Sequence, residues 1–216
     1  MRIIDLSFPI RSGMPVFPGD PEVQIGHALT VESDTVAVSA LALGSHSGTH
    51  IDAPAHTVEG GATIDAFALA DLIGEAAHLR VRRPADLARV DAAAVESPLP
   101  DRLPSLVVVT AGWDEHFGSE RMVRHPFLDP EFASELLARG MRVLVIDWLN
   151  PDPTLQDGEF ALPVHDLVLG AGGAIVENLR GAHDLPDRFE LTIAPLPIAG
   201  ADGAPVRAFA RLTDSA

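Results

Sequence analysis

Two short runs of continuous apolar residues stand out along the chain. Residues 106–110 read Leu-Val-Val-Val-Thr, and residues 143–146 read Val-Leu-Val-Ile. Runs this short and this rich in β-branched residues are typical of strands that are buried on both faces. We therefore predict two central strands at these positions.

A helix is predicted between these two strands. Asp129 can accept hydrogen bonds from the free amides of a first turn, and Pro130 suits the first helical position. The segment EFASELLAR follows, and Gly140 supplies the conformational freedom that ends many helices. Strand, helix and strand in this order predict a βαβ unit, and therefore a parallel pair of strands.

Three further segments are predicted to be strands. Residues 36–43 (VAVSALAL) approach strict alternation, and residues 189–194 and 206–212 are also rich in apolar and β-branched residues. Proline and glycine between the last two favour an antiparallel or mixed section. The predicted fold class is α/β, with a mixed β-sheet, a partly parallel core and flanking helices. The 18 glycines and 18 prolines are spread throughout, so we predict a single domain over residues 1–216.

Composition excludes several mechanisms. The chain holds 31 acidic and 15 basic residues, a net charge of −16, and it has no cysteine, lysine or tyrosine. Thiolate metal sites, cysteine nucleophiles, lysine Schiff bases and P-loop lysines are therefore impossible. The negative charge argues against nucleic acid or anionic membranes as partners. No apolar run is long enough to span a membrane, and Asp5 interrupts any signal peptide, so we expect a cytoplasmic protein.

The strongest chemical signal lies in residues 44–56, GSHSGTHIDAPAH. Three of the nine histidines of the chain fall in this segment, together with an aspartate. Gly48 and Pro54 disfavour a helix here, so we expect an extended conformation. In an extended segment, His50 and Asp52 point to the same side, because the strand period is two.

These side chains suit a metal site. His46 can return toward His50 and Asp52 through a turn at Gly48, and two imidazoles with one carboxylate suit Zn²⁺ or Mn²⁺. His56 can face the same cavity without binding metal, which is the place for a general acid or base. The alternative is a polar loop whose histidines hydrogen-bond to one another or to the backbone.

The pattern His-x-Gly-Thr-His-x-Asp-x-Pro-x-His over residues 46–56 resembles the signature of the cyclase family of metal-dependent hydrolases, which includes bacterial kynurenine formamidases. Other segments match the family in the same order along the chain, so the resemblance covers nearly all of it. These segments are residues 17–20, 110–114, 162–165, 175–179, 195–197 and 203–208. The resemblance implies a swivelling β/β/α type of fold.

The resemblance also implies roles for individual residues. His46, His50 and Asp52 match the ligands of one metal ion, and Asp52 with Glu177 matches a bridging pair to a second ion. His165 matches the imidazole ligand of that second ion, and His56 matches the catalytic residue. Without the resemblance, His165 and Glu177 would read as ordinary positions at a helix start and a strand end. The expected cofactor is a divalent metal, Zn²⁺ with Mn²⁺ as the alternative, with one or two ions per chain.

The implied reaction is hydrolysis of a C–N amide bond by metal-activated water, with His56 transferring protons. The implied substrate is a small-molecule amide, as in arylformamidases, which convert N-formylkynurenine to kynurenine and formate. Three alternatives stay open: hydrolysis of a cyclic amide such as isatin, a metal-dependent lyase or cyclase, and a non-catalytic metal-binding scaffold.

Phe17 is the expected substrate-binding residue. It lies in the segment that resembles the substrate-side loop of the family, where kynurenine formamidases carry a tryptophan. Phenylalanine can still pack against an aromatic ring, but it offers less area and no indole donor. The resemblance further implies a homo-oligomer, a dimer or a tetramer.

Overall fold

The structure is a computed structural model that describes residues 1–154 and 161–212. Its strands are β1 (Arg2–Asp5), β2 (Gln24–Leu29), β3 (Val38–Ala42), β4 (His50–Asp52), β5 (Ile73–Arg80), β6 (Arg89–Val90), β7 (Leu106–Thr110), β8 (Phe127–Leu128), β9 (Val143–Ile146), β10 (Ala174–Glu177), β11 (Arg188–Pro195) and β12 (Gly203–Leu212). Its α-helices are α1 (Val31–Asp34), α2 (Pro130–Arg139) and α3 (Pro163–Gly170). Its 3₁₀ helices are Pro54–His56, Ile64–Ala66, Leu69–Asp71, Ala92–Ala94, Trp113–His116 and Glu120–Arg124.

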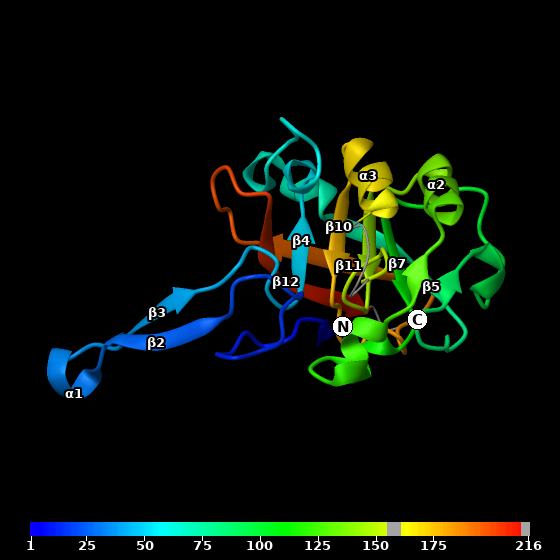
Figure 1. The fold of residues 1–216 in the computed structure, drawn as a ribbon. Helices are drawn as coiled ribbons and strands as arrows, with labels where there is room; N and C mark the ends of the chain where they lie inside the picture. The colour runs from blue at the N-terminus through cyan, green and yellow to red at the C-terminus, as the bar shows by residue number, and fades with distance from the viewer. Residues whose placement is uncertain (155–160, 213–216) are drawn as a thin grey trace.

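The main sheet closes into a barrel (Figure 1). Its strand order is β1-β12-β11-β5-β7-β9-β10-β4, and the short strand β4 pairs with both β10 and β12. Strands β5, β7, β9 and β10 run parallel to one another, whereas the remaining pairs are antiparallel. The predicted mixed, partly parallel sheet is therefore confirmed, and β4 adds the closure that the sequence patterns did not predict.

Alternate residues of the central strands line two separate cores. Leu106 and Val108 of β7 belong to the cluster inside the barrel. Val107 and Val109 belong to a second cluster, which packs the outer face of the sheet against α2 and α3. All five residues of β7 are buried, which explains why this strand is a continuous apolar run.

Helix α2 has the boundaries that the capping pattern predicts. Asp129 is the N-cap residue, and its side chain accepts a hydrogen bond from the Glu131 amide. Pro130 opens the helix, and Gly140 ends it with φ of +123°, which L-residues rarely adopt. The strands on either side, β7 and β9, pair in parallel, so the predicted βαβ unit is confirmed.

Strands β2 and β3, with α1 at their tip, form a hairpin that projects from the barrel (Figure 1). We call residues 24–42 the arm. Every residue of β3 is exposed, so its predicted strand forms without contact with the core. Within the described part of the chain, no helix is both long and apolar enough to cross a membrane.

Candidate metal centre and acid–base site

The centre is built on the outer face of β4 and β10. Ile51 and Val176 point into the barrel, where both are fully buried. Because side chains alternate along a strand, His50, Asp52 and Glu177 point to the opposite face, toward α3. The two strands are antiparallel, with Glu177 in register with His50. The predicted placement of His50 and Asp52 on one side of an extended strand is therefore confirmed.

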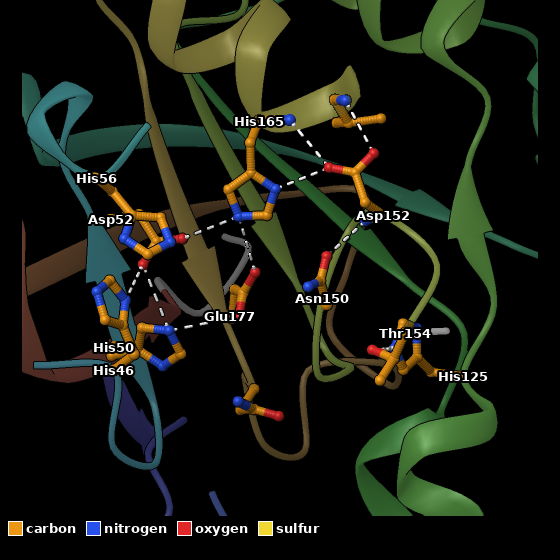
Figure 2. Close-up of polar contacts among 12 residues, drawn as sticks. His46, His50, Asp52, His56, His125, Asn150, Asp152, Thr154, His165 and Glu177 are labelled. Atoms are coloured by element: carbon orange, nitrogen blue, oxygen red, sulfur yellow. Dashed lines mark hydrogen bonds and ion pairs between the residues drawn. The ribbon is translucent and has the colours of Figure 1, made fainter. Parts of the chain in front are cut away.

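Three flanking segments add imidazoles to this face (Figure 2). His165 lies in the first turn of α3, and His56 ends the 3₁₀ helix that Pro54 begins. His46 precedes β4 and reaches the centre through the turn at Gly48, whose φ is +66°. The structure thus brings together all the metal-ligand candidates and His56.

The inner nitrogens of three imidazoles surround the two carboxylates. Asp52 Oδ1 lies 2.7 Å from His46 Nδ1 and 3.4 Å from His50 Nε2. His165 Nε2 lies 3.6 Å from both Asp52 Oδ2 and Glu177 Oε1. His50 Nε2 also lies 3.3 Å from Glu177 Oε2. Two sets of ligand atoms, each compact enough for one cation, therefore share Asp52.

The outer nitrogen of each imidazole faces a hydrogen-bond acceptor. His50 Nδ1 lies 2.9 Å from the Gly48 carbonyl oxygen, which can only accept, so this nitrogen carries a proton and Nε2 is the inward nitrogen that a metal ion could use. His165 Nδ1 lies 2.8 Å from Asp152 Oδ2. Outer acceptors of this kind orient histidine ligands in metal sites.

Both carboxylates carry an oxygen that needs a further partner. Asp52 is 1% exposed and Glu177 is 5% exposed. Asp52 Oδ2 and Glu177 Oε1 are buried and have no hydrogen-bond partner among the residues described. Leaving buried acceptors unsatisfied is costly, and a divalent cation between them would remove that cost. The donor set of imidazole nitrogens and carboxylate oxygens fits such a cation.

The buried imidazoles and carboxylates of the cluster shift one another's pKa values. Burial would raise the pKa of Asp52, but His50 and the other imidazoles hold it well below its ordinary value. Burial and the neighbouring Asp52 raise the pKa of Glu177. Burial acts to lower the pKa of His165, but Asp152, Asp52 and Glu177 outweigh it and raise that pKa to about 10. A cation at this centre would displace imidazole protons as it binds.

His56 lies beside the cluster without joining the Asp52–Glu177 core. Its ring centroid is 4.1 Å from that of His46 and 5.7 Å from that of His165, and its side chain is 28% exposed. Its Nδ1 lies 3.3 Å from Asp202 Oδ2. Burial lowers the pKa of His56, which favours the neutral imidazole that a general base requires.

A cavity of about 460 Å³ opens over the centre. Phe17, Leu149 and Leu162 line it together with the histidines and carboxylates of the centre, so its lining is partly apolar and partly polar. The volume is in the range of sites for small organic ligands. Trp113, whose segment resembles the family, is 4% exposed and packs in the outer core.

Two acidic residues of the site were missed by the sequence analysis. Asp152 is fully buried and holds His165. Asp202 lies 2.9 Å from His46 Nε2. Burial would raise the pKa of Asp202, but hydrogen bonds from His46 and other neighbours lower it to about 2. The prolines on both sides of Asp152 and the glycines around Asp202 predicted only turns, so neither position carried a signal for chemistry.

Comparison with known proteins places the chain in a family. The Cyclase family model matches residues 4–153, well over half of the chain. The chain belongs to the cyclase family. The matched residues include His46, His50, Asp52 and His56, whereas His165 and Glu177 lie beyond them.

Relatives of this cyclase-family chain span nearly its whole length. A kynurenine formamidase of Geobacillus thermodenitrificans is 31% identical over 209 residues, which cover 96% of each chain. A solved structure of a predicted metal-dependent hydrolase from Bacillus stearothermophilus matches with a TM-score of 0.78 and 28% identity, over 97% of both chains. Isatin hydrolase A from Labrenzia aggregata shares the fold, with a TM-score of 0.85 at 21% identity, over 99% of this chain and 94% of that one.

Proposed function

We propose that the chain is a metal-dependent amidohydrolase that cleaves a C–N bond other than a peptide bond. One observation carries the proposal: beneath an open cavity, one buried oxygen of Asp52 and one of Glu177 have no hydrogen-bond partner among the described residues, and the His165 Nε2 atom lies 3.6 Å from both. A centre of this composition is expensive to bury unless it serves a cation. The relatives named kynurenine formamidase and metal-dependent hydrolase support the same assignment.

We assign five side chains as metal ligands. They are His46, His50, Asp52, His165 and Glu177. Zn²⁺ is the preferred ion, because four-coordinate sites of nitrogen and oxygen ligands suit it, and Mn²⁺ is the alternative. Since Asp52 belongs to both ligand sets, the chain can hold two ions that share its carboxylate. When bound, such ions supply Lewis acidity, which polarises a carbonyl and lowers the pKa of water.

We assign proton transfer to His56. Its Nδ1 faces Asp202, which leaves Nε2 as the nitrogen that can exchange a proton with substrate or water. In amide hydrolysis, this nitrogen accepts a proton from the attacking water and returns it to the departing amine. An aniline-type nitrogen leaves more readily than an alkyl amine, so an aryl amide suits the site.

The substrate class we propose is a formylated aromatic amine such as N-formylkynurenine. The cavity is lined both by the apolar side chains of Phe17, Leu149 and Leu162 and by the metal-ligand candidates. An aryl ring can pack on the first set while its amide reaches the second. The relatives of similar length and about 30% identity that are named kynurenine formamidase support this choice.

We further propose a homodimer in which the arm contacts a second copy. Val31 is 66% exposed and Leu41 is 62% exposed, and both lie on the projecting hairpin. A two-stranded hairpin is marginally stable alone, and a group of exposed apolar side chains usually marks an interface. A second copy of the chain supplies an apolar surface of the same kind in a symmetric contact.

Hydrolysis assays on the zinc-loaded protein test the proposed function. We expect release of formate from N-formylkynurenine, with slower turnover of isatin, and loss of both activities after chelation. Turnover that survives complete removal of metal would overturn the proposal. Rapid isatin opening with no formamide cleavage would retain the metal chemistry and replace the substrate.

A further inference from the structure

Asp202 lies where the last strand of the barrel meets the centre. It directly precedes β12, and the next residue, Gly203, is in register with Asp52 of β4. The backbone carbonyl of Asp202 accepts a hydrogen bond of 2.8 Å from the Ala53 amide. A Cβ atom on Gly203 would lie 2.6 Å from the Ile51 carbonyl oxygen and 3.0 Å from the His46 ring. The close approach that glycine permits therefore holds Asp202 beside the centre.

One oxygen of Asp202 contacts two imidazoles with different assignments. Its Oδ2 lies 2.9 Å from Nε2 of His46, a metal-ligand candidate, and 3.3 Å from Nδ1 of His56, the acid–base candidate. Its Oδ1 accepts a hydrogen bond of 2.9 Å from Ser45 Oγ. The carboxylate is therefore anchored on one side while the other side faces both rings.

Each contact would select one tautomer. A proton on His46 Nε2, donated to Asp202, leaves the inward Nδ1 as the nitrogen for a metal. A proton on His56 Nδ1, donated to the same oxygen, leaves Nε2 for the substrate side. One carboxylate can thus fix the tautomer of both rings, with His46 Nδ1 free for a metal and His56 Nε2 free for proton transfer.

We propose that Asp202 is a positioning residue that orients His46 for metal binding and His56 for proton transfer. The role at His56 rests on the proposed function. The role at His46 concerns metal affinity, which can be measured without any turnover.

Two substitutions separate charge from hydrogen bonding. Asp202→Asn can keep its amide oxygen on the two histidines while its NH₂ group donates to Ser45 Oγ, because a hydroxyl can accept as well as donate. Asp202→Ala removes both the charge and the acceptor. Asp65→Asn is the matched control, since Asp65 accepts from the Gly200 amide and so supports the same loop without contact with either histidine.

The first measurement is zinc affinity and stoichiometry, by competition with a chromophoric chelator. We expect Asp202→Ala to bind zinc about 10–100-fold more weakly with unchanged stoichiometry, as found when outer partners of histidine ligands are removed. Asp202→Asn should show a smaller loss, and Asp65→Asn should match the parent. The same order of zinc affinities should persist in a His56→Ala background, where proton transfer is absent.

The second measurement is turnover of N-formylkynurenine at saturating zinc. We expect Asp202→Ala to lower kcat more than it changes KM. The decrease in kcat should be far smaller when His56 is already alanine, because Asp202 acts on proton transfer through His56.

Three results would overturn the proposal. The first is a zinc affinity of Asp202→Ala within twofold of the parent value. The second is the loss of one whole zinc equivalent, which would make Asp202 a ligand, since its carboxylate, His46 and His56 also lie close enough to hold a cation. The third is an equal effect of Asp202→Ala on kcat with and without His56. If the parent does not turn over the substrate, the proposed function fails, while the affinity series still tests the role at His46.

Discussion

Asp152 Oδ2 accepts both the backbone N–H and the ring Nδ1–H of His165, at 3.1 and 2.8 Å. Its other oxygen accepts the Val164 amide at 2.9 Å. The start of α3 is therefore held by one fully buried carboxylate, which satisfies two of the free helix amides and fixes the ring that reaches Asp52 and Glu177. The same hydrogen bonds thus cap the N-terminus of α3 and orient the ring of His165.

Replacing Asp152 by Asn should weaken both functions. Every orientation of an asparagine amide turns its NH₂ group against an N–H donor, so we expect the free energy of unfolding to fall by about 1–3 kcal/mol. Zinc affinity should fall by about 10–100-fold. Asp166→Asn, on the exposed side of the same helix, is the control and should change neither quantity. Parent-like zinc binding by Asp152→Asn would refute the orienting role.

Replacing His56 by Ala should separate chemistry from metal binding. Because His56 is not among the proposed ligands, we expect full metal content by elemental analysis. Turnover should fall by about 10²–10⁴-fold, the usual contribution of a positioned acid or base. Hydrolysis at the parent rate would show that the proton is carried by another group, and loss of metal would make His56 a ligand.

Replacing Glu177 by Gln should reduce the stabilisation that the folded protein gains from bound zinc. Burial and Asp52 raise the pKa of Glu177, so its charge is costly in the metal-free protein, and the neutral amide relieves that cost. We expect the chelator-treated variant to melt at or above the temperature of the parent. Zinc should stabilise the parent, by about 2.7 kcal/mol at 100 times Kd, and stabilise the variant much less. Equal zinc-induced shifts in Tm would exclude Glu177 as a ligand.

His125 should make the protein sensitive to mild acid. Burial lowers its pKa to about 4, below the unfolded value near 6.5, so the unfolded chain binds a proton that the native state excludes. Its contribution to stability is complete above pH 6.5 and is lost as the pH falls toward 4. Between pH 7 and pH 5, this one group should cost about 2 kcal/mol.

The test compares urea unfolding at the two pH values, followed by the fluorescence of Trp113 and Trp148. His125→Asn should lose stability at pH 7 but show a smaller decrease on acidification than the parent does. His27→Asn, on the exposed strand β2, should retain the parent slope. An identical pH slope in His125→Asn would show that His125 titrates normally in the fold.

Replacing Leu41 by Glu should disrupt association while sparing the fold. Leu41 is 62% exposed, so its substitution should change the free energy of unfolding of one chain by less than about 0.5 kcal/mol. A charge at an apolar contact should shift the protein to monomers in sedimentation velocity. Leu69→Glu, equally exposed but outside the arm, should leave the assembly unchanged. A parent that sediments as a monomer would remove the dimer proposal itself.

Much of the barrel could be predicted because its signals are local. The apolar runs at 106–110 and 143–146 match β7 and β9, and the caps at Asp129 and Gly140 set the ends of α2. Closure could not be predicted, because it depends on the three residues of β4 pairing on both edges. Such a short strand carries no periodicity of its own.

The candidate metal centre could also be predicted only in part. The spacing of His50 and Asp52 was sufficient to place them on one face, whereas His165 and Glu177 were reached only through the family resemblance. Asp152 and Asp202 were missed, because their roles depend on contacts across 13 and 156 positions of sequence. Single aspartates in turns look alike until the chain is folded.

The double pairing of β4 has a consequence for how the protein is made. A chain emerging from the ribosome exposes His46, His50 and Asp52 long before β10 and β12 have been synthesised. During that interval, the three side chains lack both the strands that flank them and the carboxylates at positions 177 and 202. Sealing of the barrel is therefore a late event, because β4 gains its second edge partner only when β12 has been made. A nascent polypeptide interrupted before position 202 would carry all five proposed metal ligands, but it would lack Asp202 and a closed barrel.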